Sequence, residues 1–190
     1  MARDGREIPI LQTIHDMFTL EYAKHPDEPL QFYNRLSMAV QSNCLYVSGS
    51  TRSKIASVFH RDLREPGHAV VIQGTTLKSS LLAQVCDIPP PIEQDSPYIL
   101  FNSSVVPRKN LELLVSSYLQ SGFHDQGIDL VVAGKLHADA YGQKIASIVS
   151  SSPRIKLLGY VSDLEKTWLY LNASLLVSPS LSEGFGKTTS

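Results

Sequence analysis

The stretch YILFNSSVVPRKNLELLVSSYLQSGFHDQGIDLVVA, residues 98–133, decides the fold class of this 190-residue chain. It opens on a short apolar run, 98–101, and closes on a second one, 128–133. Between the two runs, apolar side chains recur three and four positions apart: Leu111, Leu114, Val115, Tyr118 and Leu119. This spacing places them on one face of a helix. A strand, an amphipathic helix and a second strand in succession predict a parallel β-α-β unit.

The same alternation continues towards the end of the chain. The further elements that we expect are a second helix, a third strand and a fourth strand, at 141–149, 154–158 and 174–177. Ser162 and Glu165 have the spacing of a capping box, which predicts a third helix that starts there. Asn110 is a residue type that favours helix N-caps, so we expect it to cap the first helix. Strands that alternate with helices predict an α/β fold with a doubly wound parallel sheet.

The first part of the chain, about ninety residues, is less regular. The expected elements are strands at 8–14, 44–47 and 69–72, and helices at 32–40 and 51–58. Because this part begins directly on a strand, we interpret it as the later portion of an α/β domain rather than a whole one.

A proline cluster marks the expected domain junction. Residues 88–97 contain four prolines, which cannot join a helix or a central strand and favour an extended spacer. We therefore divide the chain into a first domain, 1–88, a proline-rich linker, 89–97, and a second domain, 98–190.

Composition excludes several classes of function. The net charge is −1 and no run is rich in lysine or arginine, so nucleic acid is not an expected partner. Cys44 and Cys86 have neither metal-site spacing nor a disulfide framework, and we interpret both as buried thiols in a reducing compartment. The polar residues 1–7 lack the apolar stretch of a signal peptide, and no window reaches the ~18 apolar residues of a membrane span. We expect a cytoplasmic protein and leave peripheral membrane contact open.

Two loops at predicted strand ends carry candidate site residues. Residues 182–186 follow an apolar run, which places Glu183 at the carboxyl end of a parallel strand, where open α/β sheets bind ligands. Arg108 and Lys109 lie between a strand and the amino terminus of a helix, a position that favours phosphate. Each has a plainer alternative: a solvated basic loop for the Arg-Lys pair, and a helix-capping carboxylate for Glu183.

Seven motifs along the chain resemble the glycosyltransferase group 1 (family 4) proteins, which have the GT-B fold. In the second part they are the strand and Pro-Arg-Lys-Asn loop of 98–110, then 131–135, 158–163, and Pro179-Ser180 with 183–186. In the first part they are 13–16 with His25-Pro26, Val47-Ser48 with Arg52, and 71–74. The resemblance covers almost the whole chain. It implies a GT-B-like α/β fold of two Rossmann-like domains, both incomplete: the later part of an acceptor-side domain in 1–88, and the first part of a nucleotide-sugar donor-binding domain in 98–190.

The resemblance implies a hexosyl- or mannosyltransferase that moves a sugar from a nucleotide-sugar to a saccharide or lipid-linked acceptor, with retention of anomeric configuration. It implies no metal and no cofactor besides the nucleotide-sugar substrate. By resemblance, Arg108 and Lys109 would stabilise the leaving phosphate. Glu183 would face the donor sugar hydroxyls, and His15 would approach the donor sugar from the other domain. The donor-binding residues that it implies are Gly134, Tyr160, Val161, Gly184, Phe185 and Gly186.

Plainer alternatives stay open for the site and for the chain. His15 could be a hydrogen-bonded histidine at a strand end, and Tyr160 could close a core edge. The family pattern includes a second glutamate seven intervening residues beyond Glu183, which is one position past Ser190. We therefore expect little or no transferase activity from this chain. The alternative functions are nucleotide or phosphate binding without turnover, and a degenerate truncated product with none.

Overall fold

The computed structural model describes residues 10–23, 25–72, 79–93 and 96–184. The chain folds as two compact units: unit 1 is residues 1–74 with 183–186, and unit 2 is residues 75–182 with 187–190. The division follows Gly74, so the predicted linker, 89–97, lies within unit 2. The roles of the two parts as acceptor-side and donor-side domains stay predictions. Among the described residues, no helix is both long enough and apolar enough to cross a membrane.

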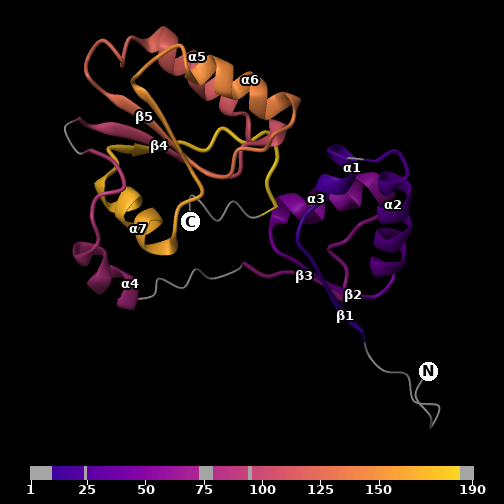
Figure 1. Ribbon diagram of the computed structural model, residues 1–190. Helices are drawn as coiled ribbons and strands as arrows, with labels where there is room; N and C mark the ends of the chain where they lie inside the picture. The colour runs from indigo at the N-terminus through magenta and orange to yellow at the C-terminus, as the bar shows by residue number, and fades with distance from the viewer. Residues whose placement is uncertain (1–9, 24, 73–78, 94–95, 185–190) are drawn as a thin grey trace. The chain divides into compact units, whose positions relative to one another are not determined.

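Unit 2 confirms the predicted alternation of strands and helices (Figure 1). Its elements in chain order are α4 (Ser79–Gln84), the 3-10 helix η1 (Val85–Asp87), β4 (Tyr98–Asn102), the 3-10 helix η2 (Pro107–Lys109), α5 (Leu111–Ser121), β5 (Asp129–Ala133), α6 (Ala140–Val149), β6 (Ile155–Gly159), α7 (Asp163–Asn172) and β7 (Leu175–Leu176). Every predicted element from residue 98 onward is present, with ends that differ by a few residues.

The four strands of unit 2 form one parallel sheet in the order β6-β5-β4-β7. Strands β4, β5 and β6 add in one direction, and the helices that connect them, α5 and α6, lie on one face of the sheet (Figure 1). The chain then returns through α7 on the opposite face and places β7 on the other side of β4. Helices thus cover both faces, which confirms the predicted doubly wound sheet.

The side chains of β4 alternate between two apolar layers. Ile99 and Phe101 belong to the cluster beneath α5 and α6. Tyr98 and Leu100 belong to the cluster that contains Leu169 of α7. The Tyr98 hydroxyl donates a hydrogen bond to the Leu169 carbonyl oxygen at 2.8 Å, which ties α7 to the sheet. Because both faces of the strand are covered, its sequence is a continuous apolar run rather than an alternation.

Both predicted capping residues occupy N-cap positions, but only one of them caps its helix with its side chain. Ser162 accepts a hydrogen bond from the Glu165 N–H at 3.2 Å, and the Glu165 carboxylate accepts one from the Ser162 N–H at 2.7 Å, so the capping box is confirmed. Hydrogen bonds that the Ser162 backbone and side chain make with the Glu165 carboxylate lower its pKa. Asn110 occupies the N-cap position of α5, as predicted, but its side chain forms no capping hydrogen bond. Asn110 is instead left-handed, with φ of 54°, and its N–H donates to the Pro107 oxygen at 3.0 Å, which closes the 3-10 turn. Asparagine is one of the few residues that adopt this conformation readily.

Unit 1 is a smaller parallel structure. Its described elements are β1 (Leu11–Ile14), α1 (Phe18–Glu21), α2 (Glu28–Ala39), β2 (Asn43–Tyr46), α3 (Gly49–Phe59) and β3 (His68–Val70), with the strands in the order β1-β2-β3. The expected strands and helices of this part are present where the structure describes them. Residues from β1, α2, β2 and α3 form one apolar cluster, which includes Ile14, Leu36, Tyr46 and Ile55.

The prediction of two buried thiols is correct for Cys44 and wrong for Cys86. Cys44 is fully buried, its thiol donates to the Ala39 oxygen at 3.1 Å, and burial raises its pKa. Cys86 lies in η1 and is exposed, because Val85 and Ile88 on either side take the core-facing positions of that short turn.

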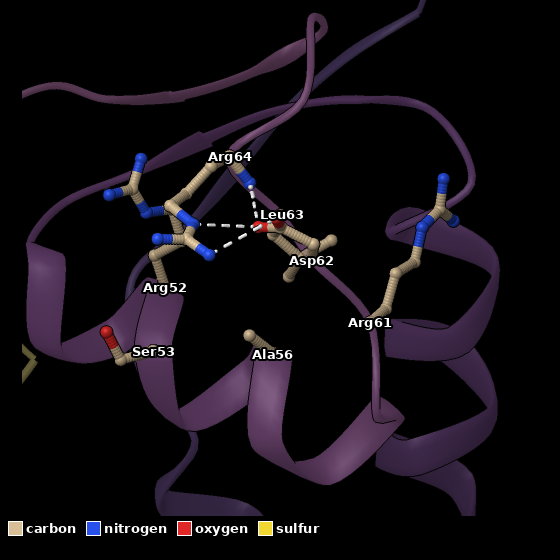
Figure 2. Close-up of a pocket in the computed structure, with 7 residues that line it drawn as sticks. All are labelled: Arg52, Ser53, Ala56, Arg61, Asp62, Leu63 and Arg64. Atoms are coloured by element: carbon tan, nitrogen blue, oxygen red, sulfur yellow. Dashed lines mark hydrogen bonds and ion pairs between the residues drawn. The ribbon is translucent and has the colours of Figure 1, made fainter.

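Two pockets lie within unit 1. One, of about 310 Å³, is formed by α3 and the segment that follows it (Figure 2). The other, of about 280 Å³, lies along β1 and α2 and includes His15 and Asp16. The two pockets share no residue.

Candidate functional site

The strand order of unit 2 creates a switch point between β4 and β7. The helix that follows β4 covers one face of the sheet, whereas the helix that leads to β7 covers the other. In open α/β sheets, ligands bind outside the carboxyl ends of the strands where the order reverses in this way. The loops that leave β4 and β7 at this point carry Arg108, Lys109 and residues 178–182.

The β4 loop holds its two cations in a defined turn. Pro107 begins η2, and the left-handed Asn110 ends it directly before α5. Arg108 is half-buried, and Lys109 is only 9% exposed, which is rare for a lysine. Both residues directly precede the amino terminus of α5, an 11-residue helix. The free N–H groups and the helix dipole favour an anion at that position.

Backbone hydrogen bonds join the β7 loop to the β4 loop. The Val177 N–H donates to Leu100 at 2.9 Å, which continues the strand pairing beyond β7. The Leu181 N–H then donates to the Arg108 oxygen at 2.8 Å, and Arg108 Nη1 donates to the Ser182 oxygen at 3.5 Å. Ser182 is 8% exposed. The structure thus brings together the two loops that the sequence indicated separately.

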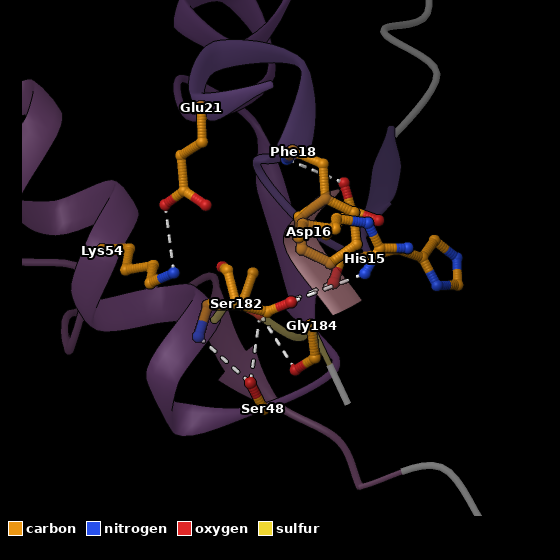
Figure 3. Close-up of polar contacts among 10 residues, drawn as sticks. His15, Asp16, Phe18, Glu21, Ser48, Lys54, Ser182 and Gly184 are labelled. Atoms are coloured by element: carbon orange, nitrogen blue, oxygen red, sulfur yellow. Dashed lines mark hydrogen bonds and ion pairs between the residues drawn. The ribbon is translucent and has the colours of Figure 1, made fainter. Parts of the chain in front are cut away.

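Gly184 lies in close contact with the backbone at the end of β1, within unit 1 (Figure 3). A Cβ at this position would overlap the His15 carbonyl oxygen, so only glycine allows the approach. Thr51 Oγ1 lies 3.3 Å from the Gly184 oxygen and 3.5 Å from the His15 oxygen, and Thr51 is 2% exposed. Glu183 is half-buried. The predicted donor residues Phe185 and Gly186 lie outside the described residues.

Thr51 is a residue that sequence reasoning missed. Its N–H donates to the Ser48 Oγ at 3.0 Å, which caps α3. Ser48 is a residue type that favours helix N-caps, but local sequence cannot indicate that the Thr51 hydroxyl lies against the backbone of Gly184, 133 residues away. That contact depends on the tertiary fold.

His15 follows β1 and exposes its side chain to solvent. Its imidazole makes no hydrogen bond with any residue that the structure describes, in contrast to the alternative of a hydrogen-bonded histidine. The neighbouring Asp16 carboxylate accepts a hydrogen bond from the Phe18 N–H at 3.2 Å. His15 and Asp16 both line the pocket of about 280 Å³, which can receive a small polar ligand beside the ring.

The remaining predicted donor residues lie at the ends of β5 and β6. Gly134 donates its N–H to the Gly159 oxygen at 2.7 Å, and a Cβ there would overlap the Ser103 carbonyl oxygen. Its lack of a side chain thus lets the loops after β4 and β5 pack together. Tyr160 is 86% exposed and Val161 is half-buried against the core on the α7 side. Among the described residues, no group of histidine, cysteine and acidic side chains could hold a metal ion.

Solved structures, among them glycosyltransferases, resemble this chain over nearly its whole length. Anabaena Alr3699/HepE, solved with UDP and glucose, is 14% identical with a TM-score of 0.67, and the match covers 93% of this chain and 47% of that one. WaaG, a glycosyltransferase involved in lipopolysaccharide biosynthesis, is 14% identical with a TM-score of 0.63, over 96% of this chain and 54% of that one. A glycosyltransferase from Rickettsia africae is 19% identical with a TM-score of 0.62, over 94% and 47%.

This chain spans about half the length of the first of these structures. At such identities the likeness shows the fold alone, which is the predicted GT-B-like arrangement of parallel α/β units. No curated protein sequence matches the chain. The family model of the glycosyl transferases group 1 matches residues 88–189, more than half of the chain and all of the strands and loops that form the β4–β7 switch point. The chain therefore belongs to the glycosyl transferases group 1 family.

Proposed function

We propose that the switch point of unit 2 binds the diphosphate of a nucleotide-sugar in a glycosyl transfer reaction. One observation carries this proposal: the loop with Arg108 and Lys109 is hydrogen-bonded to the loop that ends at Ser182. Two cations at the amino terminus of α5 are thereby held beside the residues that precede Glu183. The family match over 88–189 supports the same conclusion.

The chemistry of the step fits these side chains. When the bond between the sugar and the phosphate breaks, negative charge develops on the phosphate oxygens. Arg108 offers a planar fork of donors and Lys109 a compact charge, and both suit phosphate oxygens. Because η2 holds them in place before the reaction, they stabilise the developing charge without reorganisation. Burial of Lys109 strengthens its electrostatic interaction with an arriving anion.

The finer assignments are part of the same proposal. We assign Glu183 to the hydroxyls of the donor sugar, because a carboxylate accepts hydrogen bonds from hydroxyls. His15, with an exposed imidazole in a pocket, acts on the donor sugar, and Gly134, Tyr160, Val161 and Gly184 border the donor. The reaction is that of family 4, with retention of configuration. UDP in the Anabaena structure and lipopolysaccharide biosynthesis for WaaG support a nucleotide-sugar donor and a saccharide or lipid-linked acceptor.

Calorimetry with UDP and GDP tests the donor site. Arg108→Ala removes charge-assisted hydrogen bonds worth about 1.5–3 kcal/mol, so we expect roughly 10- to 100-fold weaker nucleotide binding. Lys144→Ala is the matched control, since Lys144 is a half-exposed cation of unit 2 that pairs with Glu112 and lies outside the site. Equal heats for the wild-type chain and Arg108→Ala would rule the donor site out.

A second candidate function is nucleotide or phosphate binding without turnover. The observation that favours it is that unit 2 holds both cation-bearing residues and the β4–β7 switch point by itself. Release of free sugar or transfer to an added acceptor from UDP-glucose, UDP-N-acetylglucosamine or GDP-mannose separates the two. Measurable transfer would exclude the second candidate, whereas nucleotide binding without transfer would favour it over the transfer reaction.

A further inference from the structure

The pocket of about 310 Å³ in unit 1 contains none of the residues proposed for the donor site. Arg52, Ser53 and Ala56 line it from α3, and residues 61–64 line it from the segment that leads to β3 (Figure 2). Its volume lies at the lower end of the range for ligand pockets, roughly 300–1,000 Å³. It can therefore receive a small organic molecule as well as a single ion.

Two of the three arginines in this pocket already have partners. Arg61 donates to Glu65 at 3.0 and 2.7 Å and to the Val40 oxygen at 3.1 Å, so most of its fork is used. Arg64 is paired with Asp62, from Nε at 3.0 Å and from Nη2 at 3.3 Å. That fork-to-carboxylate contact fixes the plane of the Arg64 guanidinium and leaves its other N–H groups available.

Arg52 has no such partner. It forms no hydrogen bond or ion pair with any residue in the described ranges, and Figure 2 shows its side chain extending to the same side of the pocket as that of Arg64. It also lies in the second turn of α3, near the helix end whose dipole is positive, and the first turn contains no acidic residue. A cation at that end of a helix is unfavourable unless an anion offsets it.

We propose that this pocket binds a phosphomonoester, with its phosphate between Arg52 and Arg64 and the Ser53 hydroxyl as a further donor. Two guanidinium groups and a hydroxyl supply hydrogen-bond donors for three phosphate oxygens. A carboxylate has only two oxygens to accept them. The dianion adds negative charge beside Arg52; Asp62, the carboxylate in the pocket lining, also attracts Arg52 but is hydrogen-bonded to Arg64. The apolar walls, Ala56 and Leu63, contact the organic part of the ester. Free phosphate shares the same anion chemistry, so the test distinguishes it from the ester.

Calorimetry on the whole chain at constant ionic strength, with glucose 6-phosphate, inorganic phosphate and glucose as probes, tests the inference. We expect glucose 6-phosphate to bind more tightly than phosphate, and glucose not to bind. Arg52→Ala removes one fork of charge-assisted hydrogen bonds and should weaken glucose 6-phosphate binding at least about tenfold. Arg52→Lys, which keeps the charge and loses the fork, should give an intermediate affinity.

Two further variants complete the design. Arg35→Ala removes an exposed arginine of the same unit that lines the pocket of about 280 Å³ instead, and it should bind the ester as the wild type does. Arg108→Ala should also keep ester binding, so failure of the donor-site proposal and failure of this one give different results. Thermal melts confirm that each variant is folded; if Arg52→Ala is not, Arg64→Ala provides the same comparison.

Three results would contradict a phosphomonoester site in this pocket. Unchanged affinity in Arg52→Ala would overturn the inference. An equal loss in Arg35→Ala would also overturn it, because it would indicate a diffuse charge effect or binding in the other pocket. Equal affinity for phosphate and glucose 6-phosphate would overturn the assignment of a phosphomonoester as the ligand, and it would indicate a site for free phosphate only.

Discussion

Replacing Tyr98 with phenylalanine removes the hydrogen bond that ties α7 to β4. The hydroxyl is buried and donates to the Leu169 carbonyl oxygen at 2.8 Å. That oxygen also accepts the Ala173 N–H at 3.1 Å, so it keeps one partner after the substitution. The cost should therefore be that of a net hydrogen bond, about 1 kcal/mol, rather than the larger penalty of an unsatisfied buried group.

The stability difference between the two proteins should depend on pH. Burial raises the pKa of Tyr98 from 10.0 to about 12. Between these values the unfolded chain has lost the phenolic proton while the folded chain keeps it, so stability falls as pH rises. At pH 11 this group alone removes about 1.4 kcal/mol from the wild type and nothing from Tyr98→Phe. The deficit of about 1 kcal/mol in the variant at pH 8 should thus shrink to near zero at pH 11.

Urea unfolding of both proteins at pH 8, 10 and 11, followed by circular dichroism, measures this difference. The comparison within one pair cancels the other tyrosines, including Tyr118 and Tyr141, whose pKa values burial also raises. A deficit that stays constant from pH 8 to pH 11 would refute the reasoning. Tyr118→Phe provides a second test of the same effect outside the α7 contact, since burial raises the pKa of Tyr118 and its hydroxyl donates to the Ile128 oxygen at 2.7 Å in the layer with α5 and α6.

Three other substitutions should lower stability by amounts that the structure sets, each measured by urea unfolding at pH 7. Ser162→Ala breaks the capping box of α7 and should cost about 1 kcal/mol, whereas Ser162→Asp should restore most of it. Gly134 has a φ of 153°, and Gly134→Ala places a Cβ against the Ser103 carbonyl. The substitution should cost about 2 kcal/mol or more and weaken nucleotide binding. A variant with wild-type stability would show that the loops after β4 and β5 do not need this close approach. Asp129→Asn removes a carboxylate, 4% exposed, that pairs with Arg154 at 3.0 Å and Lys156 at 2.9 Å. Because both cations retain solvent, the loss should be about 2 kcal/mol rather than the 3–5 of a fully buried pair, and it should shrink in high salt.

The sequence predicted the parallel α/β architecture because that information is local. Apolar periodicity separates strands from helices, and the run at β4 already indicates a strand covered on both faces. The capping box at Ser162 is likewise complete within four residues. The strand order was not predictable in this way, because it depends on β7 returning to β4 rather than adding beside β6.

The errors arise where residue type alone leaves the outcome open. Asn110 takes the predicted N-cap position, but its backbone is left-handed at the end of the 3-10 helix, and its side chain does not cap α5. Cys86 lies between two apolar residues that fill the core side of η1. In the site, the loop contacts of Arg108 could not be derived from spacing, because its partner Ser182 is 74 residues away. The pairing of the two loops is a tertiary property.

The return of β7 to β4 also sets the order in which this unit can fold. Strand β4 pairs on one edge with β5, to which it is connected by a single helix. On its other edge it pairs with β7, which follows two further helices in the chain. Pairings between segments so distant in sequence carry a larger loop-closure cost and form late. The loops of Arg108 and Ser182 therefore meet only after the rest of the sheet is in place. A nucleotide that binds both loops should slow unfolding of the finished sheet without accelerating its formation.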